Sequence, residues 1–385
     1  MRVETCDAIS AIRQDEWNAL LPGDNPFLRH EFLLALEESG SAIAETGWKA
    51  RHLLLRDDDG RAMGAMPLYL KDHSWGEFVF DQAWAQAYLR SGRDYYPKLV
   101  SCVPFTPVTG PRLLIGAGVE REHVGQTLLE AARACATRES ASSLHVLFPE
   151  PEPALATDDL LVRKDCQFHW HNDGYASFDD FLGRFTSSRR KKVRRERRRV
   201  EEDGIVFRAV SGAGIDETLM DRVYGLHSLT FMARGQLPYL TRDFFARICE
   251  TMGESLWILL AQRDGEVIAC AIFFRNSTTL YGRYWGANGR YHSLHFETCF
   301  YQAIDHCIAD GIQRFEPGAQ GEHKLRRGFD PVTTWSHHWL ADSAFQAAIG
   351  HHLSHERAWL DEYIIAARDQ LPFRRDDPAP ERGNA

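Results

Sequence analysis

The sequence predicts an α+β protein in which one domain design occurs twice. Two segments about 205 residues apart share a pattern of apolar runs around an Asp-Gly pair, although they share few letters. Each is preceded by helical material and followed by a strand, a helix and another strand. The chain has 385 residues, and a single core stops growing at about 250 to 300 residues. We therefore expect two domains, over residues 1–160 and 161–370.

The repeated segments are predicted β-hairpins. The first covers residues 52–71 with an Asp-Gly turn at 59–60, and the second covers residues 256–276 with an Asp-Gly turn at 264–265. Asp-Gly between apolar runs favours a hairpin, because Gly accepts the positive φ that tight hairpin turns require.

The remaining elements follow the same order in both halves. Helices open each half, and the first of them has Asn25 as its N-cap, Pro26 at its first position and Gly40 as its stop. A 3.6-residue apolar period predicts the later helix of each half. The predicted helices are 25–40, 123–137, 216–231, 240–253 and 294–309, and the predicted strands after the hairpins are 111–117, 142–148, 279–287 and 312–318.

Two segments have no counterpart in the other half. Residues 72–110 are predicted to elaborate the first domain, and the polar, Pro-rich residues 371–385 are predicted to form a disordered tail, because they have too little apolar surface to bury.

Charge and cysteine usage indicate the environment. The net charge of −9 argues against a surface that is basic throughout, yet residues 189–199 carry nine basic residues and one acid. The eight cysteines contain no CxxC pair and are expected to be reduced. The sequence shows neither a signal peptide nor a run of about 20 apolar residues. We expect a cytoplasmic protein without a transmembrane segment, with peripheral contact to an anionic inner membrane surface as one option.

Several stretches resemble one family. NPFLRHEFLLALEESGS, YYPKLVSCVPFTPVTGPRLL, SSRRKKVRRERRRV and RFEPGAQGEHKLRRGF are similar to the FemAB-like proteins of peptidoglycan biosynthesis or recognition, and the likeness spans residues 17–365. The resemblance implies tandem GNAT-like (Fem-type) domains, each a mixed β-sheet flanked by helices. It also implies transfer of an acyl or aminoacyl group, with a small molecule or a cell-wall precursor as acceptor.

The chain departs from the acetyl-CoA-dependent GNAT pattern. A glycine-paired loop that presents N–H groups to pyrophosphate is expected there, but the corresponding places read VEREHVGQT and NGRYHSLHF. We expect no tightly bound cofactor, with aminoacyl-tRNA or acyl-CoA as co-substrate. The helical arm inserted in several Fem proteins is absent as well.

The stretch 314–329 gathers acid, base and cation. Glu316 ends a predicted strand, Gly318 and Gly321 allow a tight loop, and His323 and Lys324 follow. Acyl transfer to an amine needs a base for the ammonium proton and a cation or N–H donors for the oxyanion. Glu316 or His323 is the candidate base and Lys324 the charge stabiliser.

A structural role is the alternative for this stretch. Glu316 can instead pair with Arg326 or Arg327, or cap the next helix. The pair His351 and His355 has i,i+4 spacing, but no further ligands accompany it, so a polar helix face is expected.

The strand at 279–287 and the following helix supply candidate binding residues: Arg283, Tyr284, Trp285, His295 and Glu297. Arg283 and Trp285 should face away from Tyr284, because side chains alternate along a strand. Trp285 can equally pack against the helix. Arg283 calls for an anionic partner, which is a ligand carboxylate, a phosphate or Glu316.

The basic run is predicted to be a helix with Ser187 or Ser188 as its N-cap and its end at Gly204, and with Val193 and Val200 as its apolar seam. This charge density favours phosphate, of tRNA or of a nucleotide-linked precursor, and a solvated helix paired with the acidic body is the alternative. The candidate phosphate-binding residues are Arg189, Lys191, Lys192, Arg194 and Arg195.

In the first half, the resemblance makes His73, Glu77, Asp81 and Lys98 candidates for substrate contact, and surface-loop or core positions are the alternative.

These features together predict an N-acyltransferase that moves an acyl or aminoacyl group to an amine acceptor. The resemblance implies a peptidoglycan precursor as one possible acceptor and aminoacyl-tRNA as one possible donor. The alternatives are an acyl-CoA-dependent N-acetyltransferase and a non-catalytic module that recognises cell-wall precursors.

Overall fold

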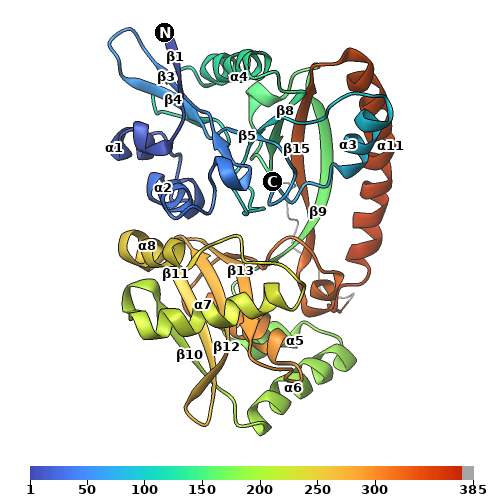
Figure 1. Cartoon of the computed structure of the whole chain (residues 1–385). Coiled ribbons are helices and arrows are strands. Elements are labelled where there is room, and N and C mark those ends of the chain that lie inside the picture. The colour runs from blue at the N-terminus through green and yellow to red at the C-terminus, as the bar shows by residue number, and fades with distance from the viewer. Residues whose placement is uncertain (375–385) are drawn as a thin grey trace. The chain divides into compact units, whose positions relative to one another are not determined.

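The computed structural model describes residues 1–374, which form two units (Figure 1). Unit 1 comprises Met1–Asp165 and Thr333–Glu362, and unit 2 comprises Cys166–Val332 and the described residues from Tyr363 onward. The units are therefore not the contiguous halves that the sequence predicted. Residues 333–362 belong to unit 1 because Leu340, Ile349 and Leu353 pack there with aromatic residues of 84–95.

Unit 1 contains two groups of paired strands. One has the order β1-β3-β4-β7, and the other has the order β15-β8-β6-β5-β2. The elements of this unit are β1 (Arg2–Cys6), α1 (Gln14–Asn18), α2 (His30–Glu38), β2 (Lys49–Ala50), β3 (His52–Arg56), β4 (Ala62–Met66), β5 (Tyr69–Lys71), α3 (Gln82–Arg90), β6 (Lys98–Ser101), β7 (Leu114–Ile115), α4 (Arg121–Arg138), β8 (Ser143–Leu147) and most of α11 (Ser343–Arg368).

The insertion at 72–110 is part of the interior of unit 1. Its strand β6 lies between β5, to which it is antiparallel, and β8, to which it is parallel. All four residues of β6 are buried. The segment therefore supplies a central strand of the sheet, rather than an addition to a finished domain.

Unit 2 is built around the strand order β10-β11-β12-β13-β14-β9. Its elements are α5 (Phe178–Gly183), α6 (Ser187–Glu202), β10 (Val206–Ser211), α7 (Glu217–Met232), α8 (Arg242–Met252), β11 (Leu256–Arg263), β12 (Glu266–Arg275), β13 (Thr279–Ala287), α9 (Leu294–Phe296), the π-helical turn η7 (Glu297–Tyr301), α10 (Gln302–Ala309), β14 (Arg314–Glu316) and the 3₁₀ helix η8 (Glu322–Arg327). The boundary between the units falls inside β9 (Leu161–His171) and β15 (Asp330–Leu340), so both strands contribute to both units.

Both predicted hairpins are confirmed. β3 pairs with β4, and β11 pairs with β12 up to Arg263 and Glu266. Asp264 and Gly265 have φ of +53° and +82°, which are the values that a two-residue hairpin turn needs. The tandem α+β fold that the sequence predicted is likewise confirmed by the elements of the two units.

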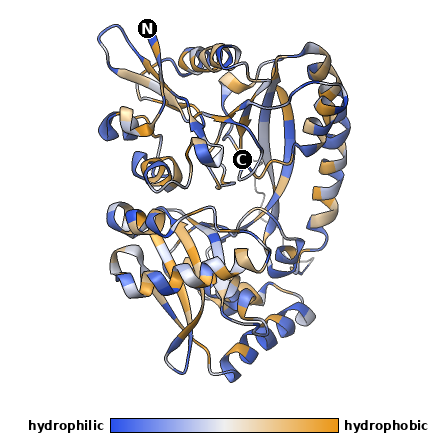
Figure 2. Cartoon of the chain, viewed as in Figure 1, coloured by the Kyte–Doolittle hydropathy of each residue, from blue (hydrophilic) through white to orange (hydrophobic). Residues whose placement is uncertain are grey.

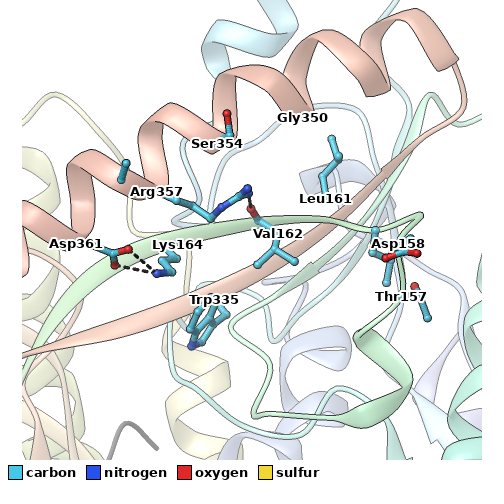
Figure 3. A pocket seen from close by; sticks show the side chains of 12 residues that line it. Thr157, Asp158, Leu161, Val162, Lys164, Trp335, Gly350, Ser354, Arg357 and Asp361 are labelled. Atoms are coloured by element: carbon cyan, nitrogen blue, oxygen red, sulfur yellow. Dashed lines mark hydrogen bonds and ion pairs between the residues drawn. The ribbon is translucent and has the colours of Figure 1, made fainter.

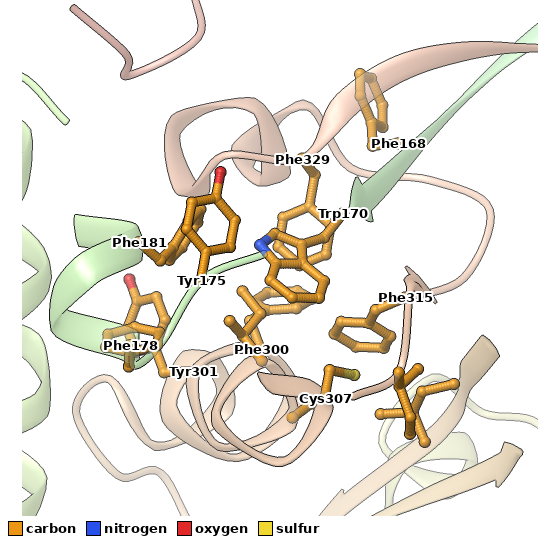
Figure 4. Packing of buried hydrophobic residues seen from close by; sticks show 14 of the residues in the cluster. Phe168, Trp170, Tyr175, Phe178, Phe181, Phe300, Tyr301, Cys307, Phe315 and Phe329 are labelled. Atoms are coloured by element: carbon orange, nitrogen blue, oxygen red, sulfur yellow. The ribbon is translucent and has the colours of Figure 1, made fainter. Parts of the chain in front are cut away.

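The core of unit 2 is rich in aromatic side chains (Figure 4). Trp170 on β9 lies opposite Phe315 on β14 in the strand register. Rings from α5 and from the helix after β13 complete the cluster, and Figure 2 shows β11 and β12 as largely hydrophobic ribbons and α6 as largely hydrophilic. This packing holds the ends of β13 and β14 in place.

The predicted tail falls partly outside the described residues. Phe373 forms an isolated bridge with Phe185 and packs edge to face against it, at 5.4 Å between ring centroids. The disorder prediction is thus wrong for residues 371–374, because Phe373 has an aromatic surface to cover. Residues 375–385 lie outside the described part.

Candidate active site

The loop after β14 depends on its glycines. β13 and β14 pair in parallel, with Tyr281 opposite Glu316. Gly318 and Gly321 then adopt φ of +94° and +120°, which side-chain-bearing residues rarely adopt. A Cβ atom at Gly321 would lie 2.5 Å from the ring of His323. The sequence GAQG therefore allows a tight path that a chain without these glycines could not follow.

Lys324 is the most perturbed cation of this loop. Its side chain is 3% exposed, and its Nζ donates a hydrogen bond to the Gly318 carbonyl at 2.6 Å. Burial lowers the pKa of Lys324 to about 7, and the neighbouring Cys299 opposes this shift. Near neutral pH the group can therefore exist either as an ammonium or as an amine.

Two imidazoles lie beside this lysine. The rings of His295 and His323 are 6.4 Å apart, and His323 also contacts Phe300 at 5.7 Å. Burial, with the positive charge of Lys324 and Arg327 in addition, lowers the pKa of both histidines, to about 4 for His295. Both rings are neutral at pH 7, and His323 is solvent-exposed, so it is able to accept a proton.

Glu316 is held from two sides. Its Oε1 lies 3.0 Å from Arg314 Nε, and its Oε2 lies 3.9 Å from Nε2 of His169. The carboxylate of Glu316 is buried. The pKa of His169 lies well below its usual range, mainly because the ring is buried and also because Arg314 is near. The sequence suggested Arg326, Arg327 or Arg283 as the ion-pair partner of Glu316. The structure instead pairs Glu316 with Arg314, two residues earlier on the same strand.

The faces of β13 differ from the predicted alternation. Tyr284 and Trp285 do lie on opposite faces, because Tyr284 packs against His227 and Trp285 packs against His295. Arg283, however, lies on the Tyr284 side, with its guanidinium 5.5 Å from that ring. The register of β12 and β13 shifts beside Arg283, and such a bulge interrupts the alternation of side chains.

Glu297 holds a neighbouring helix. Its Oε1 accepts hydrogen bonds from Arg197 of α6 at 3.1 Å and from Gln302 at 2.7 Å. The predicted continuous helix 294–309 is also interrupted, by the π-helical turn η7 that begins at Glu297. Glu297 is therefore engaged in joining α6 to η7, and we no longer assign it to substrate.

The sequence analysis missed a buried polar group that links α6 to η8. Glu196 accepts hydrogen bonds from the Tyr301 hydroxyl at 2.5 Å and from Arg327 at 3.1 Å. Arg327 also donates to the His323 carbonyl at 2.9 Å, and its guanidinium lies 3.4 Å from the Phe296 ring centroid. A signal existed, since Glu196 is the one acid of the basic run and shares the face of the apolar seam.

The basic helix is confirmed, with Val193 and Val200 buried. The predicted N-cap is wrong, because Thr186 holds that position and Ser187 and Ser188 are already helical. Five of its cations have polar partners inside unit 2: Arg190, Lys192, Arg194, Arg197 and Arg199. Within residues 1–374, no ion-pair partner lies beside Arg189, Lys191, Arg195 or Arg198. Lys191, Arg195 and Arg198 follow i, i+4, i+7 spacing, which places them on one outward face.

The candidates in the first half form a buried cluster in unit 1. Lys98 is fully buried, and it donates to Glu77 at 2.7 Å, to Ser74 at 2.9 Å and to Asp81. His73 lies apart from this cluster and bonds the Thr46 carbonyl at 3.2 Å. Burial of this ammonium between two carboxylates indicates that the cluster secures residues 74–81 to β6, and this structural role replaces the predicted substrate contact.

The described residues offer neither a metal site nor a membrane span. Residues 1–374 contain no group of three or more His, Cys, Asp or Glu side chains arranged to hold a metal ion, and His351 and His355 are exposed on α11. No helix within the same range has the length and apolarity needed to cross a membrane.

The family of the chain follows from a match that spans almost all of it. The FemAB-like family model, described as peptidoglycan biosynthesis/recognition, matches residues 8–375. The chain belongs to this family. No curated protein matches it.

Solved structures show the same fold at low sequence identity. FemX is 11% identical with a TM-score of 0.52, and the match covers 91% of this chain and all of FemX. The C-terminal domain of a putative lysylphosphatidylglycerol synthetase from Agrobacterium fabrum is 11% identical with a TM-score of 0.53, over 88% of this chain and 95% of that one. Both matches support a Fem-type tandem fold.

Proposed function

We propose that this chain transfers an aminoacyl group to a primary amine of a cell-wall precursor, at the loop after β14. The observation that carries the proposal is Lys324, a buried ammonium with a pKa of about 7 that is held at the Gly318 carbonyl beside a neutral imidazole. The family's role in peptidoglycan biosynthesis or recognition supports the choice of acceptor.

The chemistry assigns roles to two of the three predicted catalytic residues. His323 takes the proton of the incoming ammonium, because its ring is exposed and neutral. The freed amine attacks the acyl carbon of the donor, a C–N bond forms, and the ester C–O bond breaks. Lys324 in its charged form stabilises the oxyanion. The proton held by His323 passes to the leaving alkoxide, which departs as a hydroxyl, and the second proton of the attacking nitrogen is released to water. Glu316 lies against Arg314 and His169, and we give it no step in the transfer.

The donor in this proposal is aminoacyl-tRNA. Neither VEREHVGQT nor NGRYHSLHF contains the paired glycines that acetyl-CoA-dependent GNAT domains use. The second of these stretches ends in α9, which has only three residues. The outward cations of α6 supply charge for a phosphate backbone instead.

The donor can be tested by competition. Labelled acetyl-CoA and labelled aminoacyl-tRNA, each offered with a mixture of amine acceptors, should give product from the tRNA alone. Product from acetyl-CoA would establish an acyl-CoA-dependent N-acetyltransferase. Binding of cell-wall precursors with no product from either donor would establish a recognition module.

The phosphate contact of α6 has a separate test. The variant Lys191→Ala/Arg195→Ala/Arg198→Ala should weaken tRNA binding and lower the slope of log K against log salt by about 2 to 3, since each lost phosphate contact removes about 0.7 to 0.9. The matched control is the triple variant Lys49→Ala/Arg61→Ala/Arg90→Ala, which removes the same number of exposed positive charges from unit 1. Equal losses in the two variants would contradict a specific role for α6.

A further inference from the structure

Unit 1 contains an open groove lined by residues that have no part in the proposed transfer site. It lies between β9, β15 and α11 and has a volume of about 710 Å³ (Figure 3). Small-molecule sites usually measure about 300 to 1,000 Å³. The groove is therefore large enough for a ligand of several rings.

The charges of the groove cancel. Its lining carries two cations, Lys164 and Arg357, and two carboxylates, Asp158 and Asp361. Lys164 pairs with both oxygens of Asp361 at 2.8 and 2.9 Å, and Arg357 donates to the Val162 carbonyl at 2.6 Å. Because both cations are already engaged, the groove offers no surplus positive charge to a phosphate or a carboxylate, and it favours a neutral ligand.

Aromatic side chains continue the groove. Trp335 and Lys164 also line a second hollow of about 180 Å³, so the two hollows adjoin. The second hollow adds Phe80 and Trp359, which are 51% and 63% exposed. Large aromatic rings left in solvent beside a hollow usually mark a binding surface.

The chemistry of this lining matches one ligand class. A sugar ring has C–H groups on its faces and hydroxyls on its rim, so it can stack on an aromatic side chain while its rim bonds to carboxylates and hydroxyls. Trp335 provides the ring surface, and Asp158 and Ser354 provide polar groups at the edge of the groove. We infer that the groove formed by β9, β15 and α11 in unit 1 binds a neutral oligosaccharide.

The inference is independent of the proposed transfer reaction. The groove is built from residues of unit 1 alone, whereas the proposed transfer site is built from residues of unit 2. Loss of saccharide binding with transfer intact, or the reverse, would therefore separate the two proposals.

The experiment uses the full chain and a defined probe. Calorimetric titration with chitotetraose should show saturable binding, while the peptide tetra-alanine should show none. Trp335→Ala should weaken chitotetraose binding at least tenfold, and Trp335→Phe, which keeps a ring, should retain most of it. Trp359→Ala should also weaken binding, and it keeps the test valid if Trp335→Ala fails to fold.

Trp75→Ala is the matched control, because Trp75 is 68% exposed in the same unit but lines neither hollow. This variant should bind chitotetraose as the original chain does. Absence of saturable saccharide binding, preference for tetra-alanine, or equal loss in Trp75→Ala and in both the Trp335→Ala and Trp359→Ala variants would overturn the inference.

Discussion

The Lys324 side chain lies in the interior of unit 2, and among residues 1–374 its partner is a backbone carbonyl instead of an acid. Burial without a carboxylate is the reason that its pKa falls to about 7. An ammonium in this setting is poorly solvated, so it interacts strongly with a negative charge that develops beside it. This is the property that an oxyanion stabiliser requires.

The pH dependence of transfer follows from this residue. Activity should rise with pH as His323 loses its proton, through a pKa below its usual value, and should fall above about pH 7 as Lys324 becomes neutral. In Lys324→Arg the fall near pH 7 should vanish, because arginine stays protonated. The measurement is kcat/KM against pH. A fall that persists near pH 7 in the variant would assign that limb to another group.

Stability provides a second test of the same residue. Between about pH 7 and 10.5 the unfolded chain binds a proton at Lys324 that the folded chain does not, so this group makes the unfolding free energy rise with pH. Lys324→Met should reduce that rise, as measured by denaturant unfolding at several pH values. An unchanged slope would show that the ammonium is not desolvated.

At the level of elements, the buried group formed by Glu196, Tyr301 and Arg327 joins α6, η7 and η8. Lys324 lies within η8, and Arg327 holds the first turn of that helix through the His323 carbonyl. The basic helix and the candidate catalytic loop are thus connected through one guanidinium.

Arg327→Lys should destabilise unit 2 by about 3 to 5 kcal/mol, which is typical of breaking a buried ion pair. A single ammonium cannot replace the bonds to Glu196, Tyr301 and His323 together. Arg326→Lys, at the exposed neighbouring position, should change stability by no more than about 0.5 kcal/mol. Denaturant unfolding of both variants measures the difference, and similar values would contradict the role of Arg327.

The contact between α7 and β13 depends on one glycine. A Cβ atom at Gly286 would lie 2.1 Å from the Leu226 carbonyl oxygen. Gly286→Ala should therefore cost about 1 to 3 kcal/mol or more, because helix and strand must separate. Gly225→Ala, within α7 and without any atom inside 4 Å, should instead stabilise by up to about 1 kcal/mol. Thermal unfolding compares them, and a tolerated Gly286→Ala would disprove the close contact.

At the level of the whole molecule, unit 1 is assembled from two distant parts of the chain. β15 pairs with β8 from Ser336 to Leu340, and Leu353 of α11 is fully buried among residues of the insertion. Each large apolar side chain buried in this way contributes about 1.5 to 3 kcal/mol.

A fragment of residues 1–165 should consequently lack a cooperative unfolding transition, and joining residues 333–362 to it through a flexible linker should restore one. Circular dichroism during thermal unfolding and amide hydrogen exchange are the measurements. Cooperative unfolding of the shorter fragment would show that the first 165 residues fold without β15 and α11.

Local sequence patterns determined the elements and their order. These patterns depend only on residues that are near one another in the chain. The Asp-Gly turns predicted the repeated hairpins of the tandem design, and the seam of Val193 and Val200 predicted the basic helix. The glycines at 318 and 321 similarly predicted a tight loop after β14.

Tertiary structure alone decided which side chains meet. Three examples are the burial of Lys324, the pairing of Glu316 with Arg314 and the contact of Glu196 with Arg327. Each depends on how the chain packs, which the order of residues does not reveal. The bulge that turns Arg283 toward Tyr284 and the central place of β6 are further examples. Burial and strand register are set by the whole fold, and they fix both the charge of a group and the face on which it lies.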